Sequence, residues 1–174
     1  MYKHILVAID GSETSEHAFA AALQLAGESG AQLQPIYVVD NPLMAYDASG
    51  YDPTILHDAF VKEGQRLLAD TLARMKRENV TGTPRMVDVA PIGEDISERI
   101  RITANEFNAD LLVLGTHGRR GFKRLFLGSV AERVVRSANC PVLLVPSRQM
   151  QTAHVEPAQT DHADVAAAML TMPR

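Results

Sequence analysis

The stretch GTHGRRGFKRLFLGSVAERVVRSANCPVLLVP, residues 115–146, joins the end of an apolar strand pattern to a helix and another strand through an unusual loop. The loop holds four glycines and four basic residues: Gly115, Gly118, Gly121, Gly128, Arg119, Arg120, Lys123 and Arg124. Connections inside α/β proteins usually have about 2–6 residues. A loop of this length and composition indicates a function beyond packing.

The segments before this stretch repeat the alternation of strand and helix. Short apolar runs of the kind buried in parallel sheets predict strands at 4–10, 33–40, 84–90, 109–116 and 141–146. Helical spacing of apolar residues predicts a first helix from Ser12 to Gly27 or Gly30 and a second over 54–78. A third helix is expected around Ile96, Ile100, Ala104 and Phe107. A fourth is expected after Gly128, with an inner face formed by Val130, Ala131, Val134 and Val135. This order predicts an α/β fold, an open doubly wound five-stranded parallel sheet with helices on both faces. The third and fifth strands are expected at its edges.

Sheets of this type bind ligands beyond the carboxyl ends of their strands, so the loops after the first, second and fourth strands are expected to form the site. Gly115 and Gly118 are expected to let the backbone approach a ligand closely and to adopt positive φ. Gly128 and Ser129 open the next helix, whose first N–H groups attract phosphate. The pattern therefore predicts a binding site for an anion.

Two well-known phosphate motifs do not fit this pattern. A P-loop requires Gly, four residues and Gly-Lys-Ser/Thr, and no register of the loop supplies it. The dinucleotide fingerprint should follow the first strand, where AIDGSETS, residues 8–15, lacks it. The alternative that stays open is a glycine-rich turn with a solvated basic surface and no ligand.

The composition is that of one globular domain with an uneven charge. The 174 residues carry a net charge of -4, with 46% hydrophobic and 22% charged residues and a mean hydropathy of -0.07. Between residues 115 and 136, six basic side chains stand against one glutamate, which gives this segment a charge of +5 and the rest of the chain -9. A basic island on an acidic protein indicates a local anionic ligand, and it argues against binding to nucleic acid or to an anionic membrane.

The single cysteine, Cys140, excludes an intrachain disulfide and fits a reducing compartment. Residues 1–10 run directly into a strand pattern and lack the features of a signal peptide. No apolar run approaches the roughly 20 residues that span a bilayer. A cytoplasmic location is therefore expected.

The spacing G-x2-G-x9-G-S, formed by Gly115, Gly118, Gly128 and Ser129, resembles the nucleotide-binding signature of the universal stress protein family. ILVAIDGSE near the start and CPVLLVP near residue 146 are similar to the opening and closing strands of that family. The resemblance covers residues 1–147 as one domain. It implies a Rossmann-like fold with strand order 3-2-1-4-5, a homodimer and ATP binding. Residues 148–174 form a tail outside it, expected to be disordered or a short docking helix.

The resemblance also implies roles for individual residues. Asp10 would lie near the ribose and phosphates and could hold Mg²⁺ through water, although an aspartate before a glycine is often only a turn former. Val38 would offer main-chain groups to the adenine edge. The other implied binding residues are Ala8 and Ile9 beside the adenine, Leu114, Gly115, His117, Gly118 and Arg119 at the end of the fourth strand, and Gly128, Ser129 and Val130 at the phosphates.

Three functions are compatible with these residues: a nucleotide-sensing regulatory dimer in stress responses, a slow ATPase or phosphotransferase, or a nucleotide-free interaction or chaperone-like protein. Fast phosphoryl transfer needs direct Mg²⁺ ligands and a group that positions water, and the sequence offers neither beyond Asp10. The intact signature favours ATP binding. The dimer is expected to form through the fifth strand, because two edge strands related by a two-fold axis can satisfy each other.

Overall fold

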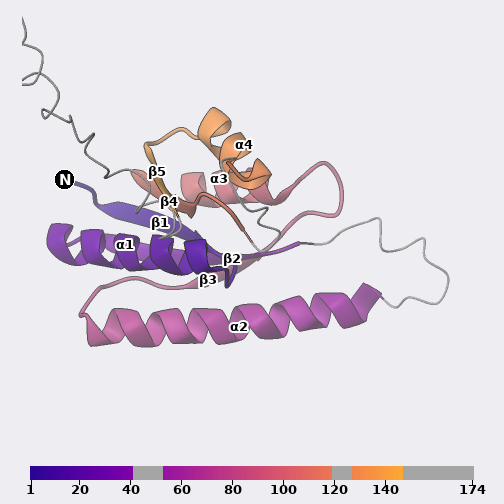
Figure 1. Cartoon of the computed structure of the whole chain (residues 1–174), viewed down its shortest axis with the longest axis horizontal. Coiled ribbons are helices and arrows are strands. Elements are labelled where there is room, and N and C mark those ends of the chain that lie inside the picture. The colour runs from indigo at the N-terminus through magenta and orange to yellow at the C-terminus, as the bar shows by residue number, and fades with distance from the viewer. Residues whose placement is uncertain (41–52, 119–126, 147–174) are drawn as a thin grey trace, which may run out of the picture.

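The computed structural model of the chain describes residues 1–40, 53–118 and 127–146 (Figure 1). The elements follow one another as β1 (His4–Ile9), α1 (Glu13–Ser29), β2 (Gln32–Val39), α2 (Pro53–Arg77), β3 (Arg85–Asp88), α3 (Ile96–Glu106), β4 (Leu111–Gly115), α4 (Ser129–Ser137) and β5 (Val142–Val145). The predicted strands agree with these bounds to within two residues.

The five strands form one parallel sheet in the order β3-β2-β1-β4-β5. The predicted order and both predicted edge strands are confirmed. In the middle of the sheet, β1 pairs with β2 in a register that places Ile9 beside Tyr37, and with β4 in a register that places Val7 beside Val113. The carboxyl ends of β2, β1 and β4 therefore lie side by side at one edge of the sheet.

Helices cover both faces of the sheet, as predicted (Figure 1). Alternate residues of β1 explain the two layers, because successive side chains of a strand point to opposite faces. Ile5, Val7 and Ile9 belong to the core under α1 and α2, and Leu6 belongs to the core under α3 and α4. All four side chains are buried. Such residues make β1 apolar without the polar alternation of a half-exposed strand.

The first helix begins and ends where the sequence predicts. Ser12 caps α1, since its hydroxyl accepts a hydrogen bond from the Ser15 N–H at 3.3 Å. Gly30 ends the helix in the left-handed conformation with φ of 70° and donates its N–H to the Ala26 carbonyl, a common helix stop. The N-terminus of α1 is thereby held at the end of β1.

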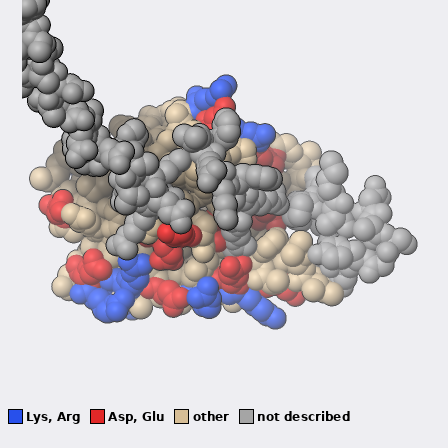
Figure 2. Space-filling view, in the orientation of Figure 1, with Lys and Arg blue, Asp and Glu red and all other residues tan. Residues whose placement is uncertain are grey.

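The outer surface of α1 and α2 has an ordinary mixed charge. The charged side chains of α1 are acidic, whereas α2 carries side chains of both signs, so the two signs are mixed on this surface (Figure 2). Arg74 of α2 joins the two helices, because its guanidinium lies 3.1 Å from Glu16 and 4.7 Å from the centroid of the Phe19 ring. Interspersed charges of both signs are typical of a solvated surface.

The prediction that Val135 lies on the inner face of α4 is wrong. Ala131 and Val134 are buried, but Val135 is 45% exposed. The described chain has no strand beyond β5, so no further element covers the outer flank of α4. The strand β5 shows the same effect, since all four of its residues are only half-buried.

Candidate functional site

The predicted binding residues lie around the carboxyl ends of the three central strands. Val38 lies in β2 and Asp10 directly follows β1. Gly115 is the last residue of β4, and His117 and Gly118 come directly after it. Gly128 precedes α4, and Ser129 and Val130 are its first two residues. Arg119 falls outside the residues that the structure describes.

Three of the predicted residues can offer little beyond their main chain. Ile9 and Leu114 are 5% and 4% exposed, because their side chains pack into the two cores. The side chain of Ala8 also packs against the core under α3 and α4.

Hydrogen bonds hold the start of α1 against the end of β4. Asp10 Oδ1 accepts the Ser12 N–H at 3.0 Å and the Ser12 hydroxyl at 2.6 Å. The Thr14 hydroxyl donates to the main-chain oxygen of His117, a residue 103 positions later. The turn after β1 and the turn after β4 therefore form one braced unit, and Asp10 is both a turn former and a member of the candidate site.

The two glycines after β4 are needed for close packing within the protein. A β-carbon at Gly115 would lie 2.8 Å from Thr14 Oγ1, and one at Gly118 would lie 2.7 Å from Asp10 Oδ2. Neither glycine has positive φ, so that part of the prediction is wrong. In the described chain the positive-φ glycines are elsewhere, among them Gly11 in the turn between β1 and α1. The glycines after β4 exclude a side chain because α1 and Asp10 approach their backbone.

Gly128 brings the start of α4 back to this turn. Its N–H donates to the Thr116 carbonyl at 2.8 Å, while the Thr116 N–H donates to the Val145 carbonyl at 3.0 Å. As the N-cap residue of α4, Gly128 has no side chain that could bind the first N–H groups of the helix. These groups have no partner within the helix, so this terminus suits an anion.

His117 carries an unpaired ring nitrogen at the same place. Its Nδ1 lies 3.0 Å from the Thr116 hydroxyl. Its Nε2 is buried and has no hydrogen-bond partner among the residues that the structure describes. Buried polar atoms are nearly always hydrogen-bonded in folded proteins, so a buried nitrogen without a partner indicates a missing partner such as a bound ligand.

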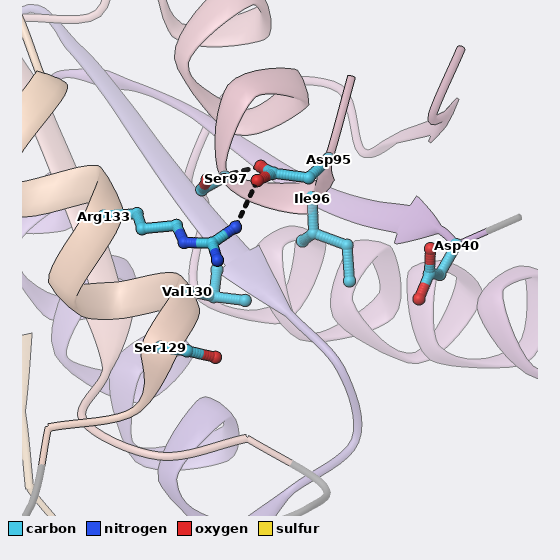
Figure 3. Close-up of a pocket in the computed structure, with 7 residues that line it drawn as sticks. All are labelled: Asp40, Asp95, Ile96, Ser97, Ser129, Val130 and Arg133. Carbon is cyan, nitrogen blue, oxygen red and sulfur yellow. Dashed lines mark hydrogen bonds and ion pairs between the residues drawn. The ribbon is translucent and has the colours of Figure 1, made fainter. Parts of the chain in front are cut away.

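A pocket of about 150 Å³ adjoins the start of α4 (Figure 3). It is lined by Asp40, Asp95, Ile96, Ser97, Ser129, Val130 and Arg133. The prediction included only Ser129 and Val130 of these residues. Ligand pockets of drug-sized molecules have about 300–1,000 Å³, so this pocket is too small to enclose a ligand of that size.

The sequence carried a signal for some of the missed residues. Asp40 follows the second strand at the sheet edge where ligands bind. Asp95 precedes Glu98 and an apolar helical pattern, which is typical of a helix start. In the structure the Asp95 carboxylate accepts the Glu98 N–H at 3.0 Å and caps α3. Arg133 carried no comparable signal, because its partner lies 38 positions away on another helix.

The electrostatics of the pocket centre on Asp95. A hydrogen bond from the Ser97 hydroxyl, the Glu98 N–H and the nearby Arg133 guanidinium together hold the pKa of Asp95 below its ordinary value, although burial opposes them. The carboxylate is therefore ionised at neutral pH, and it forms a charged pair with Arg133 at 2.5 Å.

The described residues contain neither a cluster of metal-ligating side chains nor a helix that could span a membrane. Among residues 1–40, 53–118 and 127–146, no three His, Cys, Asp or Glu side chains gather as a metal site would need. None of the helices described there is long and apolar enough to cross a membrane.

Comparison with known proteins gives consistent matches over this domain. The model of the universal stress protein family matches residues 1–146. A universal stress protein of Methanocaldococcus jannaschii is 36% identical over 146 residues, which cover 83% of this chain and 82% of the relative. A crystal structure of a universal stress protein family member from Burkholderia pseudomallei is 49% identical, covers 83% of this chain and 96% of its own, and has a TM-score of 0.70. A universal stress protein crystallised in complex with cAMP is 29% identical, with coverage of 84% and 98% and a TM-score of 0.61.

Proposed function

Because the chain belongs to the universal stress protein family, we propose that it binds an adenine nucleotide, with ATP as the expected ligand, at the carboxyl ends of β2, β1 and β4. The observation that carries this proposal is the start of α4, where Gly128 leaves the helix without a side-chain cap beside the braced turn of Asp10 and Gly118. The complex of a 29% identical relative with cAMP supports an adenine nucleotide as the ligand class.

The roles of the residues follow from their positions. The phosphates bind to the N–H groups of Ser129 and Val130 at the start of α4. The base lies against the main chain of Val38, Ala8 and Ile9, and Leu114 contributes main-chain atoms from β4. The ribose and phosphates lie along the turn formed by Gly115, His117, Gly118 and Arg119. The buried Nε2 of His117 gains a hydrogen-bond partner from the ligand.

Asp10 is the residue that would hold Mg²⁺ carried by ATP. One of its oxygens accepts the two hydrogen bonds from Ser12, and the other faces Gly118. A single carboxylate that acts through water, with phosphate oxygens as the other ligands, is a common way to bind this ion. Because Asp10 would act on the ion through water rather than as a direct ligand, we propose nucleotide binding rather than rapid hydrolysis as the function.

Nucleotide carried through purification tests this proposal. Mass spectrometry of the denatured protein should find an adenine nucleotide, and calorimetry on nucleotide-free protein should show binding of ATP and AMP but not of GTP. Binding of ATP should weaken at high salt, because charges exposed to solvent are screened beyond about 8 Å at physiological ionic strength. It should also weaken when Arg119 and Arg120 are replaced by alanine, because these changes remove two positive charges. Absence of any adenine nucleotide binding by the folded protein would refute the proposal.

We also propose a homodimer through β5. Its residues are half-buried, and it lies at the edge of the sheet. The carbonyls of Pro141 and Val145 accept hydrogen bonds from Leu112 and Thr116. Since backbone groups of a strand alternate in direction, Val142 and Leu144 direct theirs to the open edge. A second copy related by a two-fold axis would pair with them.

The cellular role proposed is that of a regulatory dimer in the cytoplasm that senses nucleotide in stress responses. The single cysteine and the net charge of -4 are in keeping with a reducing compartment and with a small-molecule ligand. Residues 1–147 form the domain in this proposal, and residues 148–174 form a tail that does not contribute to the site. Deletion of the tail should leave ATP affinity unchanged and lower the melting temperature by a few degrees at most.

A further inference from the structure

Arg133 lines the pocket together with the phosphate-binding start of α4. It comes four residues after Ser129 on the same helix, and Figure 3 shows its side chain reaching across the pocket to Asp95 at the start of α3. The guanidinium Nη1 lies 2.5 Å from Asp95 Oδ2. Arg133 therefore joins the two helices that border the pocket.

This ion pair can open at little cost. The side chains of Arg133 and Asp95 are 64% and 47% exposed, and ion pairs so exposed to water contribute little to stability. By contrast, Arg99 and Glu94 nearby are 20% and 7% exposed, and Glu94 also accepts the Ala90 N–H, so that pair is a structural brace.

Asp95 can also release Arg133 without the loss of its other contacts. Its Oδ1 accepts the Ser97 hydroxyl at 2.5 Å and the Glu98 N–H at 3.0 Å, while Arg133 binds Oδ2. The cap of α3 thus depends on one oxygen and the ion pair on the other.

A phosphate at the start of α4 would be a stronger partner for this guanidinium. A phosphate monoester carries a charge of about -1.5 to -2 at neutral pH, more than one carboxylate. The planar guanidinium matches phosphate oxygens with two donors. Arg133 lines the same pocket as Ser129 and Val130, whose N–H groups belong to that helix start.

We propose that Arg133 is a specificity residue that exchanges partners: it binds Asp95 in the unliganded protein and transfers to a phosphate group of the bound nucleotide. This inference rests on the proposed function and adds to it a preference for phosphorylated ligands over the nucleoside. Asp95 is then a competitor of the ligand for the same guanidinium. Removal of the arginine and removal of its competitor should change affinity in opposite directions.

The experiment compares Arg133→Met, Asp95→Asn and the control Arg136→Met by calorimetry with AMP and with adenosine. Arg136 lies on the same helix and pairs with Glu132 at 2.7 Å, and neither residue lines the pocket. Arg133→Met should bind AMP about tenfold more weakly, as for a lost hydrogen bond to a charged group. Asp95→Asn keeps an oxygen for the cap and should bind AMP up to about fivefold more tightly. Arg133→Lys should recover part of the AMP affinity.

Adenosine separates this inference from the function on which it rests. All four variants should bind adenosine as the wild type does, and their melting temperatures establish that they are folded. Equal AMP affinity in all variants, or weaker AMP binding by both Arg133→Met and Asp95→Asn, would overturn the exchange, the second result showing a static brace instead. If wild-type protein bound neither AMP, ATP nor adenosine, the proposed function itself would fail.

Discussion

Gly118 lies so close to Asp10 that a β-carbon at position 118 would come within 2.7 Å of the Asp10 Oδ2 oxygen. The two residues follow different strands, β4 and β1, and meet where these strands end side by side. The contact explains why a glycine is needed at this point of the turn even though its φ is not positive.

Gly118→Ala should therefore weaken nucleotide binding more than it weakens the fold. The new methyl group must displace Asp10 or the turn after β4, and ATP affinity should fall about tenfold. Gly27→Ala is the matched control, since its β-carbon would meet only Val80 at an ordinary 3.7 Å. That variant should keep its affinity and gain roughly 0.5–1 kcal/mol in stability, because it replaces a glycine inside a helix. Wild-type ATP affinity in Gly118→Ala would place the ligand away from this turn.

Gly128→Val should abolish ATP binding while the domain stays folded. The backbone of Gly128 has φ of -61° and ψ of 147°, which any residue can adopt. Its β-carbon would lie 3.2 Å from the Thr116 carbonyl, a tight contact that a small shift relieves. The branched methyl groups would then occupy the space in front of the first N–H groups of α4. Calorimetry measures the loss, and circular dichroism shows whether α4 and the sheet persist.

Gly128→Ser provides a second, chemical test at the same position. Serine is a good N-cap and should hold or slightly raise the melting temperature. Its hydroxyl oxygen would accept the N–H groups that the phosphates require, so ATP affinity should fall even though the helix is more stable. A stabilised variant with undiminished affinity would argue against phosphate binding at this helix start.

The sequence was sufficient for the fold because the relevant signals are local. The run that includes Ile5, Leu6 and Val7 is apolar on both faces because both faces of β1 are buried. Ser12 and Gly30 mark the two ends of α1 through their own backbone preferences. Val135 shows the limit of such reasoning. Helical spacing places it with the inward residues of α4, but it is exposed because β5 lies at the edge of the sheet and nothing in the described chain covers this side of the helix.

The site was less accessible to prediction because its remaining determinants come from distant segments. The requirement for glycine at position 115 arises from Thr14, a residue of another element, and a positive φ was therefore the wrong explanation. The partner of Arg133 lies on a different helix, and no periodicity links the two residues. Spacing along the chain located the start of α4 but could not show which side chains line the space beside it.

Val142→Pro should convert the proposed dimer into a monomer. The N–H of Val142 points to the open edge of the sheet in the β4–β5 pairing, so its loss removes no hydrogen bond to β4. Val142→Thr keeps the N–H and the branched shape and should remain dimeric. Sedimentation velocity distinguishes the two states. A proline variant that sediments like the wild type would exclude edge pairing through β5.

Asp110 should contribute to stability in a pH-dependent way, because its carboxylate joins the starts of β4 and β1. Its Oδ2 accepts the Lys3 N–H at 2.7 Å and its Oδ1 accepts the His4 N–H at 3.0 Å. Burial raises the pKa of Asp110, but these backbone hydrogen bonds outweigh it and leave the pKa below the ordinary value of 3.8. A carboxyl group with a lowered pKa in the folded state stabilises the protein above its unfolded pKa, and this contribution is lost as the pH falls through the folded value.

Asp110→Ala should accordingly lower the free energy of unfolding by about 1–2 kcal/mol at pH 7, as expected for two backbone N–H groups that lose a charged acceptor. The difference from the wild type should stay constant from pH 7 down to about pH 5 and shrink below about pH 4, where the wild-type carboxylate takes up its proton. Urea unfolding at several pH values measures both free energies. Asp70→Ala is the control, because the Asp70 side chain is 63% exposed and pairs with Arg66 on the same helix. A gap between Asp110→Ala and wild type that did not shrink in acid would show that Asp110 acts through packing rather than through its charge.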